Sequence, residues 1–147
     1  MKNILYISLI FLTSLSYAQT RDTITTISDG SWATTTNWDT GVVPDNDQTN
    51  NTDDLIITHN ITLTDDLSLK GGTTLTIEGC DTLTINGDVS FANGSMLVVE
   101  DCAALIINGN VTNNNNSTDV EIDGYIIING NFRISSKIPR KRIKNRY

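Results

Sequence analysis

The sequence predicts an all-β protein, a right-handed parallel β-helix (β-solenoid) of about four rungs with three short strands in each. Three observations support this fold class. Apolar residues between Leu55 and Ile134 come in pairs two positions apart, the pairs recur with a period of about 22 residues, and the shortest corner repeats an Asn-Gly pair. Periods of this length are typical of stacked repeat architectures.

Residues 1–18 are predicted to be a cleaved secretory signal peptide. Lys2 supplies a positive charge before the apolar run 4–15, and the small residues Ser16 and Ala18 stand where a signal peptidase reads the chain. A membrane anchor is the alternative, but the run is shorter than the roughly 20 apolar residues that span a bilayer. We therefore expect a secreted chain with no transmembrane segment in its mature form.

Residues 19–52 are predicted to form an N-terminal cap. This segment holds both tryptophans of the chain, Trp32 and Trp38. An indole ring can cover a large apolar area, as the open end of a β-solenoid requires. Stacking of the same two rings on a sugar is the alternative, which would make them a glycan contact.

Residues 53–134 are predicted to form the β-solenoid itself. Side chains two apart in a strand point to the same side, so each apolar pair should face the interior. Six such positions in each of four rungs make 24 sites, and 23 are apolar, Asn113 being the exception, in a chain that is 38% hydrophobic. In rung order the pairs are Leu55/Ile57, Leu75/Ile77, Leu97/Val99 and Val120/Ile122 for the first strand, Ile61/Leu63, Leu83/Ile85, Leu105/Ile107 and Ile126/Ile128 for the second, and Leu67/Leu69, Val89/Phe91, Val111/Asn113 and Phe132/Ile134 for the third.

The corner after the second strand repeats an asparagine and a glycine in the last three rungs. Neighbouring rungs lie about 4.8 Å apart, so equivalent corner residues should stack in columns. The asparagine side chains should form an amide ladder, and the glycines should occupy a tight turn with positive φ. The residues are Asn86, Asn108 and Asn129 in the ladder and Gly87, Gly109 and Gly130 beside it.

The two cysteines of the chain, Cys80 and Cys102, occupy equivalent places 22 residues apart. Adjacent rungs would bring their Cα atoms to about 5 Å, which is within the range that a disulfide needs. An exported chain meets oxidising conditions, so a disulfide is one expectation and two stacked thiols are the other. Two cysteines without further ligands make a poor zinc site.

Carboxylates also form columns. Glu78, Glu100 and Asp123 directly follow inward residues of the first strand, and Asp66 and Asp88 repeat the pattern at the second corner, between the second and third strands. Like charges stacked this closely are unfavourable unless water screens them or a cation bridges them. Solvated carboxylates are the first expectation and calcium is the alternative, because the sequence has no calcium-loop motif. No other cofactor is indicated.

The sequence does not indicate a catalytic centre. Carboxylate pairs serve glycosidases and lyases, but these carboxylates follow regular columns with no basic residue near them. The only histidine, His59, lies in the corner Thr58-His59-Asn60, which favours a structural role over that of a general base. We therefore expect a protein that is not an enzyme.

An apolar patch is expected on the outer side of the second strands, toward the C-terminal end. Ile106 and Ile127 stand where earlier rungs have threonine, and Tyr125 is close to them. Such residues favour contact with further chain, a second subunit or a ligand, and self-association through the uncapped last rung is expected to be feasible. Threonines at 74–76 and 82–84 resemble the arrays of ice-binding solenoids, but the next rung breaks the pattern.

Residues 135–147 are predicted to be a basic, disordered tail. The last eleven residues carry six Lys or Arg, whereas residues 19–136 carry a net charge of −14. Because an acidic body repels nucleic acid, no nucleic-acid partner is expected. Tethering of the tail to an anionic surface, at roughly 1 kcal/mol per cation, is one alternative. Truncation or a frame shift of a longer chain near Ser136 is the other.

The segment before the first rung resembles the start of known extracellular proteins. Its order is Trp32, Trp38, Gly41 and Pro44, followed by acidic residues, a strand and His59. This order resembles secreted bacterial surface proteins with a right-handed β-helix, and it is similar to the G8-type domain of extracellular proteins. The resemblance covers roughly residues 28–132, and it implies adhesion, display or polysaccharide contact, usually within a larger protein.

The sequence thus favours a secreted, non-enzymatic β-solenoid module with a structural or adhesive role at or outside the cell surface. It could be the N-terminal piece of a larger surface protein, with an extracellular polysaccharide or another surface protein as its partner. The alternative is a minimal relative of β-helical polysaccharide lyases or hydrolases. Such enzymes generally need a longer coil and a groove flanked by loops, whereas the corners here are short.

Overall fold

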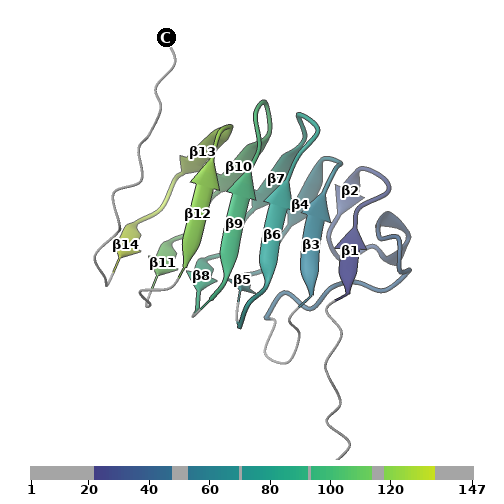
Figure 1. The fold of residues 1–147 in the computed structure, drawn as a ribbon, viewed down its shortest axis with the longest axis horizontal. Helices are drawn as coiled ribbons and strands as arrows, with labels where there is room; N and C mark the ends of the chain where they lie inside the picture. Colours follow the sequence, from purple (N-terminus) through teal and green to yellow (C-terminus); the bar gives the residue numbers. More distant parts are fainter. Residues whose placement is uncertain (1–21, 48–52, 70, 93, 114–117, 135–147) are drawn as a thin grey trace, which may run out of the picture.

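The computed structural model describes residues 22–47, 53–69, 71–92, 94–113 and 118–134. The predicted signal peptide and basic tail lie outside these residues. The described chain is all-β, a parallel β-solenoid with a repeat of about 22 residues, so the predicted fold class is confirmed (Figure 1). Its one helical turn is η1, Thr35–Asn37. Among the described residues, no helix has the length and hydrophobicity of a membrane span.

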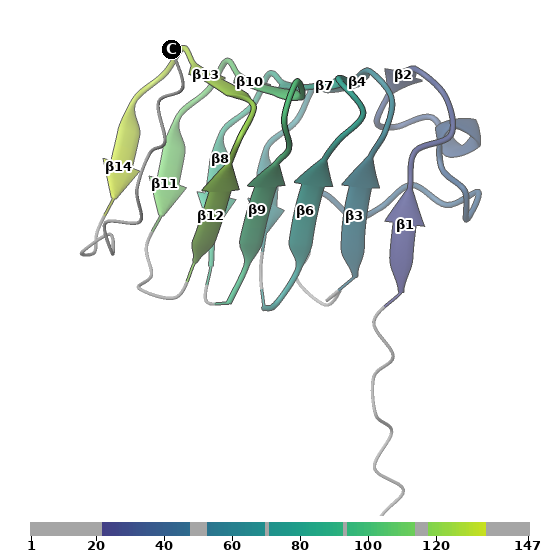
Figure 2. The same cartoon turned by 45° about the horizontal axis from the view of Figure 1, so that its top comes forward.

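Three parallel sheets form the sides of the coil, and their strands lie side by side along its axis (Figure 2). The first sheet contains β1 (Thr23–Thr25), β3 (Asp54–Ile57), β6 (Thr74–Ile77), β9 (Met96–Val99) and β12 (Asp119–Ile122). The second contains β2 (Gly30–Ser31), β4 (Ile61–Leu63), β7 (Thr82–Ile85), β10 (Ala104–Ile107) and β13 (Tyr125–Ile128). The third contains β5 (Leu67–Leu69), β8 (Val89–Phe91), β11 (Val111–Asn113) and β14 (Phe132–Ile134).

The register of the sheets is the one that the apolar repeat predicts. Leu97 pairs with Leu75 in the first sheet, Leu105 with Leu83 in the second, and Val111 with Val89 in the third. A slip of one residue would turn the whole apolar set of a strand outward. The pairs that the sequence indicates are thus enough to fix the alignment of the rungs.

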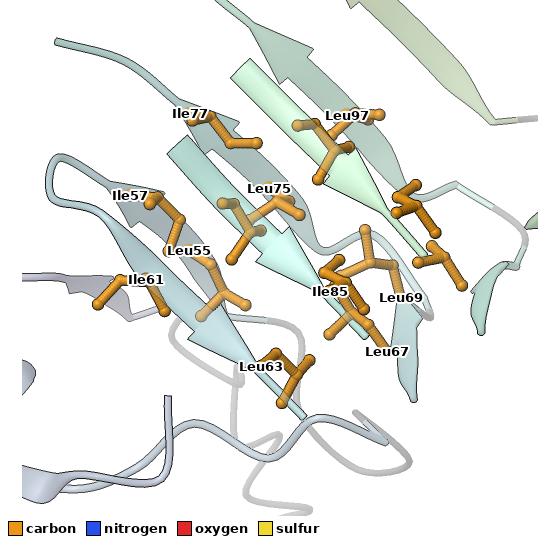
Figure 3. Close-up of a cluster of buried hydrophobic side chains, with 14 of the residues drawn as sticks. Leu55, Ile57, Ile61, Leu63, Leu67, Leu69, Leu75, Ile77, Ile85 and Leu97 are labelled. Carbon is orange, nitrogen blue, oxygen red and sulfur yellow. The ribbon is translucent and has the colours of Figure 1, made fainter. Parts of the chain in front are cut away.

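The core is a column of aliphatic side chains that runs along the inside of the coil. Leucine and isoleucine from all three sheets meet there, as Figure 3 shows for Leu55, Leu75 and Leu97 of the first sheet and their neighbours. The inward residues of β3 to β10 are all buried. Each well-buried aliphatic side chain contributes roughly 1.5–3 kcal/mol, so this column is the main source of stability.

The coil begins earlier than the sequence indicates. β1 pairs in parallel with β3, and β2 pairs with β4, so the segment assigned to the cap adds two strands to the sheets. Only Ile24 of these strands enters the core. A strand of three residues with one apolar side chain has no detectable period, and this explains why the extra partial rung was not predicted.

The last rung has the apolar pattern of the others without their burial. Val120, Ile122 and Phe132 occupy inward positions of β12 and β14, yet 47%, 47% and 57% of their surfaces are exposed. Ile126 and Ile128 of β13 pack against the core only in part. No strand of the described chain pairs with the far edges of β12, β13 and β14, so nothing in that part of the chain covers this end.

Candidate functional site

The two tryptophans close the N-terminal end of the core. Trp32 and Trp38 are only 2% and 1% exposed, and their rings meet edge to face with centroids 4.8 Å apart. The Trp32 Nε1–H donates to the Pro44 carbonyl at 3.0 Å, and the Trp38 Nε1–H donates to the Trp32 carbonyl at 2.8 Å. Because both rings are buried, neither has a face on which a sugar could stack. The structure agrees with the capping role and corrects the glycan-contact alternative.

The cap also occupies the edges of the sheets at this end. The Asp39 N–H donates to the Thr25 carbonyl, and the Thr25 N–H donates to Asp39 Oδ1, which blocks the edge of β1. At the third sheet, the Ser68 N–H of β5 donates to the Asn46 carbonyl at 2.7 Å. The N-terminal end is therefore closed both in its core and at these strand edges.

The predicted asparagine ladder is present at the corner after the second sheet. The Asn108 side-chain amide donates to Asn86 Oδ1 at 2.8 Å, and the Asn129 amide donates to Asn108 Oδ1 at 2.7 Å. All three side chains are exposed. The ladder thus joins three rungs on the surface, because the amide of each later asparagine donates to the asparagine of the preceding rung.

The glycines beside this ladder have a different cause from the predicted one. Gly87, Gly109 and Gly130 do not have positive φ. A Cβ at any of them would collide with backbone atoms of the preceding rung, such as the Gly87 carbonyl oxygen in the case of Gly109. These positions need glycine because stacked rungs approach closely there, and the expectation of a positive-φ turn was wrong.

A second ladder, which runs through Asp66 and Asp88, holds the corner before the third sheet. Asp66 Oδ1 accepts the Asp88 N–H at 2.7 Å, and Asp88 Oδ1 accepts the Asn110 N–H at 2.7 Å. Asn110 Oδ1 in turn accepts the Asn131 N–H at 3.0 Å. Sequence reasoning missed Asn110 and Asn131 because it followed charge rather than the shared acceptor oxygen. The two carboxylates act here as backbone acceptors.

The other acidic column follows the first sheet at Glu78, Glu100 and Asp123. The register of β6, β9 and β12 stacks these positions, and Glu100 and Asp123 are exposed whereas Glu78 is half-buried. In the described ranges, no three His, Cys, Asp or Glu side chains gather in a way that would hold a metal ion.

Cys80 and Cys102 form a disulfide between the second and third rungs. Their Cα atoms are 4.5 Å apart, and both residues lie at the exposed corner between the first and second sheets. Both also have positive φ, 65° for Cys80 and 74° for Cys102. This conformation disfavours residues with a Cβ, and nothing in the sequence indicated it.

His59 has a structural environment at the equivalent corner of the first rung. Its Nδ1 lies 3.0 Å from the Thr26 carbonyl oxygen and 3.0 Å from Thr58 Oγ1. Thr58 Oγ1 also donates to the Thr26 carbonyl at 2.8 Å. The histidine therefore ties the partial N-terminal rung, β1 and β2, to the first rung.

A shallow hollow lies between the Asp88 ladder and the outer face of the third sheet. Its volume is about 250 Å³, and its lining offers a carboxylate, two amides, a hydroxyl and a guanidinium: Asp88, Asn110, Val111, Thr112, Asn131 and Arg133. Arg133 is the only Lys or Arg within the described residues. The volume is below the roughly 300–1,000 Å³ of small-molecule pockets.

The predicted apolar patch lies on the outer face of the second sheet. Ile127 pairs with Ile106, and Tyr125 pairs with Ala104. Tyr125 is 68% exposed and Ile127 is 49% exposed, whereas Ile106 is half-buried. The patch is thus concentrated on β13, beside the uncovered end of the coil.

Comparison of the chain with protein-family models, curated proteins and solved structures found no match in any of the three.

Proposed function

We propose that this protein is a secreted, non-enzymatic β-solenoid module with a structural or adhesive role at or outside the cell surface. The observation that carries the proposal is the use of its polar side chains. Asp66, Asp88 and His59, which could serve chemistry, are engaged in hydrogen bonds that join one rung to the next. The side chains build a rigid coil, which is what a structural or adhesive element needs.

The location outside the cell rests on two features of the sequence and the structure. The first 18 residues have the charge, apolar run and small residues of a signal peptide. The Cys80–Cys102 disulfide is the kind of bond that persists in oxidising compartments. Expression in a secreting host should give an extracellular chain that begins at Gln19, as N-terminal sequencing would detect. A chain that is retained in the cell would contradict the proposal.

The hollow beside Arg133 is the proposed contact with an extracellular polysaccharide. Its amide, hydroxyl and guanidinium groups can hydrogen-bond the hydroxyls of a neutral sugar, whereas Asp88 and the acidic body of the coil disfavour an acidic sugar. The hollow is open at the surface, so a long polymer could lie across it. Surface display and polymer contact are therefore compatible on the same coil.

Glycan-array binding tests this contact. Arg133→Gln should weaken binding to neutral polysaccharides about tenfold, because one charge-assisted bond is lost, and Thr112→Val should weaken it less. Thr84→Val, on the outer face of the second sheet, is the matched control and should bind normally. Binding that is equal in all variants would remove the hollow from the proposal.

An enzymatic role is the competing function, and the ladder geometry allows a clean test. Asp88→Asn keeps the acceptor oxygen for the Asn110 N–H, as Asn110 does in the next rung, but removes the carboxylate. If the protein acted on acidic polysaccharides through Asp88, turnover would be abolished while the fold remained. We expect no turnover in either form, and turnover lost in Asp88→Asn would overturn the structural proposal.

A further inference from the structure

Within the described chain, the C-terminal end of the coil is an apolar surface that no further strand covers, bordered by open strand edges. Val120, Ile122 and Phe132 are about half exposed, whereas Leu97, Val99 and Val111, which precede them in the same columns, are 1–2% exposed. Monomeric proteins rarely leave strand edges and a large apolar area open together. The end therefore has the composition of an interface.

The opposite end of another copy cannot cover this surface. Trp32 and Trp38 fill the core there, and residues 37–46 occupy the edges of β1 and β5. Head-to-tail stacking would need those edges free. A second copy can therefore approach only with its own C-terminal end, which is the arrangement of an isologous dimer with a two-fold axis.

The two-fold symmetry determines which strands meet. An axis perpendicular to the coil reverses the strand direction, so the strands of the two copies pair antiparallel. One strand of the last rung then meets its own counterpart, and the other two exchange partners. β12 is a poor choice for self-pairing, because Asp119 and Glu121 would face like charges. β13, Tyr125–Ile128, has no charge and can pair with itself.

This choice makes the remaining contacts complementary in charge. With β13 on the axis, the acidic β12 of each copy lies along β14 of the other, which carries Arg133. Opposed residues of antiparallel strands share a face. When the outward Glu121 meets the partner subunit's Arg133, the inward Ile122 lies opposite the partner subunit's Phe132.

We propose that two copies of this chain join through their last rungs, with β13 pairing across a two-fold axis and β12 pairing with β14 of the other copy. The pairing extends each sheet across the junction and covers the inward side chains of both last rungs. The assembly stops at two copies, because both of its outer ends are capped. The dimer forms without glycan, although it engages Arg133, which also lines the proposed glycan hollow.

Sedimentation velocity of the whole chain, without glycan, tests this proposal over a range of concentrations. We expect a monomer–dimer equilibrium with no larger species. Ile127→Lys, close to the axis, should weaken dimerisation at least tenfold by placing like charges near each other. Val42→Lys is the matched control, since Val42 is an exposed apolar residue at the capped end, and it should dimerise as the original chain does.

A charge exchange separates the proposed contact from a folding defect. Glu121→Arg alone and Arg133→Glu alone should each weaken dimerisation about tenfold, because each reverses two symmetry-related contacts. The double variant should restore it to within about threefold. A chain that is monomeric throughout, that polymerises, or that dimerises only after removal of residues 136–147 would overturn the proposal. So would a double variant as weak as the single ones.

Discussion

The two ends of this coil differ in how the last side chains of the core are covered. At the N-terminal end, Trp32 and Trp38 cover the core and are almost fully buried. At the C-terminal end, Phe132 continues the column of Val111 but is 57% exposed. In a solenoid, each inward side chain is covered from both sides along the axis. Its burial therefore depends on the next rung as much as on its own sequence.

This contrast explains why stability cannot be spread evenly along the chain. Repeat proteins gain much of their stability from the interfaces between neighbours, and among the described strands the last rung has a neighbour on one side only. Opening should therefore begin at β12–β14 and end at the cap. The following variants test the difference in stability between the two ends. They are measured as dilute monomer, so that the proposed dimer does not cover the last rung.

The largest effect is expected at the cap. Trp38→Ala should lower the free energy of unfolding by about 3–5 kcal/mol, because it removes a buried ring and leaves the Trp32 carbonyl without its donor. Tyr125→Ala is the aromatic control at the bare end, where the ring is 68% exposed, and it should change stability by about 0.5 kcal/mol or less. Urea unfolding measures both. Equal losses would mean that the ends do not differ.

A pair of isoleucines from one column makes the comparison inside the core. Ile77 is fully buried and Ile122 is 47% exposed at the equivalent position two rungs later. Ile77→Ala should cost about 2–5 kcal/mol, and Ile122→Ala should cost about 1 kcal/mol or less. Urea unfolding measures the loss of stability in both variants. A cost at Ile122 that matches the one at Ile77 would show that the last rung is covered in the monomer.

The disulfide lies between the two ends and should limit how far opening spreads. Cys80→Ser with Cys102→Ser should lower stability by about 3 kcal/mol, the value expected for a loop of this size. Hydrogen exchange should then accelerate in β9–β11 and much less in β3–β5. The double glycine variant is the control for backbone strain, because both positions have positive φ, and it should be more stable than the double serine variant.

The smallest effect concerns the close approach of the corner glycines. Gly109→Ala should cost about 1–3 kcal/mol, since its Cβ would collide with the Gly87 carbonyl and the following rung limits any shift. Gly130→Ala should cost less, because the last rung can move outward. Thermal unfolding of the two variants tests this order. A larger loss at Gly130 would contradict a loosely held last rung.

The sequence predicted those parts of the structure that follow from the repeat alone. To predict the column of Leu75 and Leu97 and the ladder of Asn86 and Asn108, the repeat period and the alternation of side chains along a strand are sufficient. The backbone conformations of single residues could not be predicted from the repeat. The positive φ of Cys80, for example, follows from the path of one corner. Ile24 was missed because one apolar residue in a three-residue strand carries no period.

The same limit applied to the side chains considered for function. The sequence does not distinguish a buried tryptophan from an exposed one. The buried positions of Trp32 and Trp38 depend on the Pro44 carbonyl and the neighbouring backbone, which accept their indole N–H groups. The sequence marks Asp88 as a charged residue, but its role in the structure is to accept the Asn110 N–H of the next rung. Function was hard to infer because each residue's partner lies one repeat away.

The corner ladders also have a direction. In the ladder of Asp66, Asp88, Asn110 and Asn131, the acceptor oxygen belongs to the earlier rung and the N–H to the later one. A completed rung thus presents the acceptor oxygens that the next rung needs, so the coil can grow from its capped N-terminal end. We expect protection to advance from β3 to β14 during refolding, which pulsed hydrogen exchange would show. Assembly in the reverse order would mean that the ladders follow folding rather than guide it.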